Sequence, residues 1–157
     1  MIKIVLASKS KVRKEILDKN NIPNQVEVSN IDEDIVKKSL LKESALPEII
    51  SKNLAELKAN KVSQKIKDTL VLGADSVIDL NNELISKPHD RKEAFEILKK
   101  LNGKKHNLIS SICISKNGSM LWNYTDKATL TMKKMTSDEL DGYLSKISDE
   151  ALYSYNV

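Results

Sequence analysis

The sequence predicts one α/β domain, and three observations support this prediction. Apolar runs of strand length alternate along the chain with segments in which apolar residues recur at helical spacing. Turn signals such as Asn117-Gly118 separate the runs, and we find no repeat or linker between them. The length of 157 residues suits a single domain, which at this size buries roughly two thirds of the surface of its unfolded chain.

Two strands and one helix are expected in the first part of the chain. The apolar run 2–7 predicts a buried strand, and residues 11–20 predict a helix for which Ser10 is the N-cap. The alternation at 25–28 predicts a second strand. The acidic stretch 32–34 has no turn glycine and no clear period, so we expect a solvent-exposed loop there.

A long helix is expected to begin at Pro47, because proline is favoured in the first turn of a helix. Its predicted core-facing stripe contains Ile50, Leu54, Leu57 and Lys61. Lys58 follows Leu54 by one helical repeat, which predicts a position at the border of the buried face. The apolar run 70–74 predicts another buried strand, which ends at Asp75.

The rest of the chain continues the alternation. A hairpin is predicted around Asn81-Asn82, and a helix over 90–101, opened by a capping-box pair. Strands are predicted at 107–114 and 119–132, followed by a helix that Thr136 caps. The alternation at 151–157 predicts the beginning of a further strand.

Composition limits the classes of function. The chain has 26 Lys and Arg against 22 Asp and Glu, a net charge of +4, and only 4% aromatic residues, which disfavours a nucleic-acid partner. The single Cys113 excludes a disulfide framework and suits a reducing compartment, so we expect a cytoplasmic protein. No apolar run is long enough to span a membrane, and no membrane partner is expected.

The junction between the first strand and helix is a candidate phosphate site. A helix start presents unpaired backbone N–H groups and a positive dipole end. Ser8 and Ser10 add hydroxyls there, and Arg13 adds a guanidinium that binds phosphate in a bidentate manner. The alternative is a capped helix with a solvated basic first turn, and the residues by themselves leave both readings open.

Two acidic positions are candidate metal ligands. Asp75 adjoins an apolar strand, where a charged carboxylate is costly unless it is paired or bound to a metal. Mg²⁺ uses one or two protein carboxylates together with phosphate oxygens, so a carboxylate from 32–34 together with Asp75 would suit it. By themselves, the residues also allow a solvated loop at 32–34 and a turn contact for Asp75.

Lysines Lys58 and Lys87 are candidate phosphate ligands. Lys58 borders a predicted core, and Lys87 precedes Pro88, which holds the backbone before it extended. With 24 lysines in the chain, a packed stem with a solvated ammonium remains the ordinary alternative for each.

Taken together, these segments resemble one family, the Maf proteins, also called septum-formation-inhibitor or nucleoside triphosphate pyrophosphatase proteins. The resemblance runs in register from Ile4 to the last residue. The segments that carry it are Leu6-Ala7-Ser8-Lys9-Ser10 with Arg13, Asp32-Glu33, 54–59, 72–77, Lys87-Pro88, 94–103 and His106. Each motif is weak alone, whereas the ordered set is specific.

The resemblance implies a fold related to inosine triphosphatases, with an elongated, twisted, mixed sheet flanked by helices and two lobes around a nucleotide cleft. It implies hydrolysis of nucleoside triphosphates between the α and β phosphates, with Mg²⁺ or Mn²⁺ as cofactor. By motif position, Asp75 takes the general-base role and holds the metal with Glu33. The phosphate-binding positions are Ser8, Ser10, Arg13, Lys58 and Lys87.

Two positions depart from the family pattern. Pyrimidine-nucleotide members show Ser-Pro-Arg-Arg where this chain has Ser10-Lys11-Val12-Arg13, and members similar to 7-methyl-GTP pyrophosphatases carry a bulky apolar residue at the position of Val12. Ser76 instead resembles the pyrimidine type. Val12 and Ser76 are expected to line the base pocket, and the preferred base stays open.

Family members continue beyond the position of Val157, so residues 1–157 are expected to form a single Maf-like domain that is incomplete at its C-terminus and poorly active alone. The expected partner is a nucleoside triphosphate, and the sequence leaves open whether the chain forms a homodimer. The alternative function is a nucleotide-binding regulator of cell division that does not hydrolyse its ligand.

Overall fold

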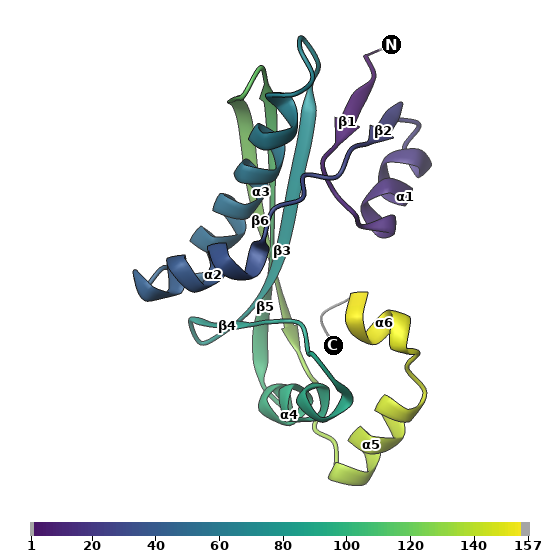
Figure 1. Ribbon diagram of the computed structural model, residues 1–157. Helices are drawn as coiled ribbons and strands as arrows, with labels where there is room; N and C mark the ends of the chain where they lie inside the picture. Colours follow the sequence, from purple (N-terminus) through teal and green to yellow (C-terminus); the bar gives the residue numbers. More distant parts are fainter. Residues whose placement is uncertain (1, 155–157) are drawn as a thin grey trace. The chain divides into compact units, whose positions relative to one another are not determined.

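The computed structural model describes residues 2–154 (Figure 1). The chain divides into two compact units. Unit 1 contains residues up to Ser76 together with 110–126, and unit 2 contains 77–109 together with the chain from Lys127 onward. A six-stranded mixed sheet contributes strands to both units, in the order β2-β1-β3-β5-β6 with β4 paired to β3. The strands are β1 (Ile4–Leu6), β2 (Asn24–Val26), β3 (Val71–Leu80), β4 (Glu83–Ile85), β5 (Lys105–Lys116) and β6 (Ser119–Thr131).

Unit 1 begins with the predicted strand–helix–strand. Helix α1 (Lys11–Lys19) links β1 to the parallel strand β2, and β1 also pairs in parallel with β3. Ser10 caps α1 as predicted, accepting a hydrogen bond from the backbone N–H of Arg13. The apolar core of this part is formed by β1 with the residue that follows it, by β3 and by the third helix. Its buried side chains are Val5, Ala7, Val62 and Val71.

The acidic stretch is helical, and the loop expected there is wrong. Asp32 caps α2 (Glu33–Lys42) by accepting from the backbone N–H of Ile35, so Glu33 lies in the first turn. Acidic residues favour the start of a helix, because they cap its first N–H groups and interact favourably with its positive end. Hydrophobic periodicity does not reveal this preference. No residue of α2 is buried, which explains why the apolar signal is weak.

Helix α3 (Pro47–Ser63) starts at proline as predicted and packs closely on β3. The predicted stripe needs correction, because Leu57 is 41% exposed whereas Lys58 is buried. The close approach depends on Gly73, since a Cβ built there would lie 2.2 Å from the carbonyl oxygen of Ala55 and 2.9 Å from the Cβ of Ala59. The small residues of α3 therefore face the sheet, and Lys58 lies among them.

Strand β3 continues through Asp75, whereas the sequence predicted that the strand ends there. It runs without interruption to Leu80 and turns at Asn81-Asn82 into the antiparallel strand β4, which confirms the hairpin. The second predicted hairpin is confirmed as well, because Asn117 and Gly118 both take the positive φ that a two-residue turn requires. Asp75 is thus a strand residue.

Unit 2 is held by helices α4 (Arg91–Leu101), α5 (Ser137–Ser145) and α6 (Asp149–Ser154). Asp90 caps α4, and Thr136 and Glu139 form the predicted capping box of α5. The core residues shared by these helices are Ala94, Leu98, Leu140, Leu144 and Leu152. The strand predicted at 151–157 is wrong up to Ser154, where α6 buries Leu152 between its neighbours; residues 155–157 lie outside the described residues.

None of the described helices is both long enough and apolar enough to cross a bilayer.

Candidate functional site

The candidate site is built on an ion cluster in unit 1. Asp75 of β3 and Lys58 of α3 are each only 5% exposed, whereas the side chain of Glu33 is 40% exposed. The Lys58 ammonium donates to Asp75 Oδ1 at 3.0 Å and to the Ala74 carbonyl oxygen at 3.3 Å, and its Nζ lies 2.8 Å from Glu33 Oε1. An ammonium has three N–H donors, so these three oxygens match its full capacity.

Burial is the main influence on the pKa of Asp75. Removal from water raises the pKa of the Asp75 carboxyl, and the ammonium of Lys58 opposes this shift without cancelling it. The charge of Glu33 adds to the increase, whereas Lys37 of α2 lowers the pKa slightly. Asp75 Oδ2 is buried and has no hydrogen-bond partner among the described residues. The cluster therefore contains one carboxylate oxygen that is ready for a further ligand.

Ser51 is a further residue of the site, because it contacts the backbone of Asp75. It was not predicted from the sequence. Its hydroxyl is fully buried on α3 and donates to the backbone carbonyl oxygen of Asp75 at 3.1 Å. Ser51, Ala55 and Lys58 recur at i, i+4 and i+7, so the helical period contains a signal for this face. An apolar scale hides that signal, because two of the three residues are polar.

A second group of side chains lies at the carboxyl end of β1. The Ser8 hydroxyl oxygen accepts from the backbone N–H of Ser10 at 3.2 Å and from the Arg13 guanidinium at 3.0 Å. Because a hydroxyl accepts two hydrogen bonds and donates one, the remaining capacity of Ser8 is its own O–H donor. Ser8 is 6% exposed, and the chain therefore presents a fixed hydroxyl donor beside a guanidinium.

Arg13 links the group at the end of β1 with the ion cluster, because it bonds to Ser8 and interacts electrostatically with Asp75 and Glu33. Burial lowers the pKa of its guanidinium, while the charges of Asp75 and Glu33 raise it. Arginine stays protonated over the whole physiological range, so this cation is permanent. The parallel pairing of β1 with β3 runs to Leu6↔Leu72, and the backbone N–H of Ala7 donates to the Leu72 carbonyl oxygen, so Ser8 follows directly after the paired residues. Strand ends of this kind are where open α/β sheets bind ligands.

Three further predicted residues are Val12, Ser76 and Lys87. Val12 is 39% exposed in the first turn of α1, and Ser76 exchanges a hydrogen bond of 3.0 Å with Ser110 of β5. Lys87 lies exposed in unit 2 between β4 and α4. Six of the predicted residues interact within unit 1, namely Ser8, Ser10, Arg13, Glu33, Lys58 and Asp75, and Lys87 belongs to the other unit.

The donor set suits a divalent cation that shares its coordination with a substrate. Within 2–154 no group of three or more His, Cys, Asp or Glu converges, so the protein offers two carboxylates, Asp75 and Glu33. Mg²⁺ is commonly held by one or two carboxylates and completed by phosphate oxygens and water. The unbonded Asp75 Oδ2 gives such an ion a ligand atom that no other described group engages.

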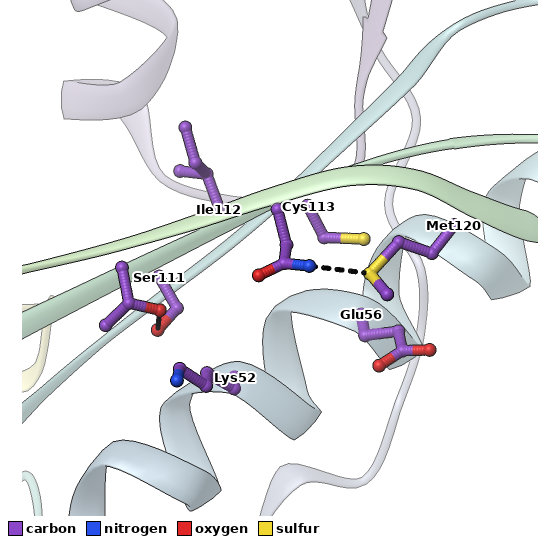
Figure 2. A pocket seen from close by; sticks show the side chains of 8 residues that line it. Lys52, Glu56, Ser111, Ile112, Cys113 and Met120 are labelled. Atoms are coloured by element: carbon purple, nitrogen blue, oxygen red, sulfur yellow. Dashed lines mark hydrogen bonds between the residues drawn. The ribbon is translucent and has the colours of Figure 1, made fainter.

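Helix α3 also lines a pocket of about 140 Å³ against β5 and β6 (Figure 2). Lys52 and Glu56 border it from the helix, and Cys113 and Met120 border it from the strands (Figure 2). Lys52 forms a partly exposed ion pair with Glu48 of the same helix, at 3.8 Å. Burial raises the pKa of the Cys113 thiol, which makes it a poor nucleophile at neutral pH.

The comparisons with known proteins agree with the motifs. The profile of the family described as Maf-like protein matches residues 3–153. The chain belongs to this family. A protein named nucleoside triphosphate pyrophosphatase from Pelagibacter ubique (strain HTCC1062) is 70% identical over 154 residues, which cover 98% of the Maf-like chain and 79% of the relative. A protein named 7-methyl-GTP pyrophosphatase from Brucella abortus biovar 1 (strain 9-941) is 35% identical, over 98% of this chain and 77% of the relative.

A solved structure supports the fold of the Maf-like chain. The HAM1 protein from Coxiella burnetii superposes with a TM-score of 0.50 at 16% identity, over 82% of this chain and 71% of the other. At this identity the likeness concerns the fold alone. It confirms the predicted mixed α/β sheet flanked by helices.

Proposed function

We propose that this Maf-like chain is a nucleoside triphosphate pyrophosphatase, which hydrolyses its substrate to a nucleoside monophosphate and pyrophosphate. The observation that carries the proposal is the ion cluster of the buried Asp75 and Lys58 with the partly exposed Glu33, next to which the charge of Arg13 is felt. Burying charged groups is costly, and carboxylates with a pKa perturbed by burial and charge partners are concentrated at functional sites. The names of the relatives supply the reaction.

The cations and hydroxyls of the site bind the phosphates in this proposal. Arg13 supplies a planar guanidinium for bidentate contact, and the spare O–H of Ser8 donates to a phosphate oxygen. Ser10 fixes the start of α1, whose positive end favours an anion. Lys58 and Lys87 are proposed as further phosphate ligands, Lys87 on its motif position alone.

Asp75 is the proposed general base. Its carboxylate orients the attacking water and accepts the proton, and a raised pKa increases its basicity toward that proton. Asp75 and Glu33 are also the residues that would hold a divalent cation, Mg²⁺ or Mn²⁺, whose charge when bound offsets that of the triphosphate. Ser51 keeps the backbone of Asp75 in place.

The choice of base is proposed to depend on Val12 and Ser76. Val12 presents an apolar side chain of which 39% is exposed, and Ser76 presents a hydroxyl already bonded to Ser110. An apolar contact beside a hydroxyl suits the flat, partly polar face of a nucleobase. The relatives include proteins named for both a general and a 7-methyl-GTP activity, and the preferred base is therefore left to experiment.

We assign the activity to the cytoplasm because the single Cys113 is a free thiol.

One assay tests the function directly. Pyrophosphate release is measured from UTP, CTP, dTTP, ATP, GTP and 7-methyl-GTP, each with Mg²⁺, with Mn²⁺ and with a chelator. We expect release from at least one of these nucleotides, with metal only. Tight nucleotide binding without any release would favour the regulatory function instead, and the absence of both would overturn the proposal.

A further inference from the structure

The Lys58 ammonium has no hydrogen-bond donor left for a phosphate. Its three N–H groups match the three oxygens within reach, those of Ala74, Asp75 and Glu33. The side chain is 7% exposed, so water does not supply alternative partners. To contact a phosphate, as the proposed function requires, Lys58 must first leave at least one of these acceptors.

Release of the ammonium is unfavourable unless another cation replaces it. Asp75 and Glu33 contact the same nitrogen atom, so without that cation the buried carboxylate of Asp75 and the 40% exposed carboxylate of Glu33 would face each other with no counter-charge between them. Breaking a buried pair by removing one partner strongly destabilises a protein, because it leaves an uncompensated charge. The replacing cation must therefore bind these same two carboxylates.

A divalent cation meets this requirement, and the cluster is prepared for it. Carboxylate oxygens are the preferred ligands of Mg²⁺ and Mn²⁺. Asp75 Oδ2 is buried and makes no hydrogen bond within the described part of the chain, so an ion gains it as a ligand without competition. Lysine carries its charge on a flexible four-carbon stem, which permits a short movement of the ammonium.

We propose that Lys58 occupies the cation position between Asp75 and Glu33 in the nucleotide-free protein, and that a divalent cation exchanges with it when the triphosphate binds. The displaced ammonium then contacts the phosphates. Metal and triphosphate consequently strengthen each other's binding, because each stabilises the arrangement that the other needs. This exchange rests on the proposed function only in naming the triphosphate as the anion that receives Lys58.

The test measures Mn²⁺ affinity without nucleotide, by electron paramagnetic resonance titration of the whole chain. Lys58→Gln removes the competing charge and keeps an amide donor, so we expect Mn²⁺ to bind at least about tenfold more tightly than to the wild-type chain. Lys61→Gln is the matched control, since Lys61 lies one turn further along α3 and donates to the Asn30 carbonyl oxygen. Its affinity should equal that of the wild type.

Equal, weaker or absent Mn²⁺ binding by folded Lys58→Gln would overturn the exchange, because it would mean that Lys58 positions the carboxylates for the metal. If that variant does not fold, the wild-type chain decides. Nitrogen-15 NMR should detect one exchange-protected lysine ammonium without metal, and saturating Mg²⁺ should abolish that signal. A signal that persists at saturation excludes the exchange.

The result separates this inference from the proposed function. Metal affinity is read without turnover, so a chain that shows the exchange and releases no pyrophosphate would refute the function and leave the exchange standing. A chain that releases pyrophosphate while Lys58→Gln binds Mn²⁺ no more tightly would refute the exchange alone.

Discussion

Helix α3 carries lysine beside carboxylate at two places, and the two differ in burial. At Lys58, the ammonium is 7% exposed and lies within 3.0 Å of carboxylates from α2 and β3. One and a half turns earlier, Lys52 is 45% exposed, lies 3.8 Å from Glu48 of its own helix and borders the pocket of Figure 2. Both places pair a lysine with carboxylate, but Lys58 is enclosed and meets carboxylates from two other elements, whereas Lys52 is open to solvent and meets one from its own helix.

The difference shows that enclosure, and not composition, makes the candidate site. An exposed i, i+4 pair contributes a few tenths of a kcal/mol and leaves both groups with nearly ordinary chemistry. The enclosed cluster shifts the pKa of Asp75 and leaves one carboxylate oxygen unbonded. Such perturbation gives a carboxylate the capacity to act as a base or a metal ligand.

The largest expected effect is on Asp75. Asp75→Asn keeps the size of the side chain and removes the base, so pyrophosphate release should fall by about a thousandfold or more while the chain stays folded. Asp79→Asn is the control, because Asp79 lies on the same strand and its carboxylate accepts from the backbone N–H of Asn82 in the turn, away from Lys58. An active, folded Asp75→Asn protein would refute the catalytic assignment.

Lys58 and Lys52 of α3 should differ strongly in their effect on stability. Lys58→Met leaves Asp75 and Glu33 without their counter-charge and should lower the free energy of unfolding by about 3 kcal/mol at neutral pH. Lys52→Met should change it by less than about 0.5 kcal/mol, because that pair is exposed. Urea unfolding at low metal concentration measures both. Equal effects would remove the contrast between the two places.

The close packing that encloses the cluster should depend on Gly73. Gly73→Ala places a Cβ 2.2 Å from a backbone oxygen of α3, and the forced separation should cost roughly 2–3 kcal/mol of stability. Gly142→Ala in α5 is the contrasting change, because its Cβ would meet no atom within 4 Å and the better helix former should stabilise by about 0.5–1 kcal/mol. Thermal unfolding compares the two variants. A neutral Gly73→Ala would show that α3 moves away freely.

The smallest effect concerns pH. The folded-state pKa of Asp75 is raised, mainly by burial, so its contribution to stability is fully present below the unfolded pKa of about 3.9 and is lost as the pH rises through the folded value. Relative to Asp75→Asn, the wild-type chain should therefore lose stability as the pH rises from about 4. Urea unfolding of both proteins across this range measures the difference. A difference of opposite sign would show that the attraction of Lys58 outweighs burial.

Much of the fold could be predicted, because its signals are local. Ser10, Thr136 and the Asn117-Gly118 turn determine helix starts and a hairpin through contacts within a few residues. The helix at Glu33 could not be seen, because it buries no residue and therefore has no core-facing stripe. The strand predicted from residue 151 onward was wrong for a different reason. Alternation over a few residues also fits a short helix such as α6.

The family, the order of most elements and the residue types of the candidate site can be read from the sequence, since motifs, caps and turns are encoded locally. Three-dimensional packing is what encloses Lys58, joins it to Asp75 and Glu33, and brings the hydroxyl of Ser51 to the backbone of Asp75. These facts depend on how closely α3 approaches β3 at Gly73. Burial and charge pairing arise from segments distant in sequence, so no local pattern contains them.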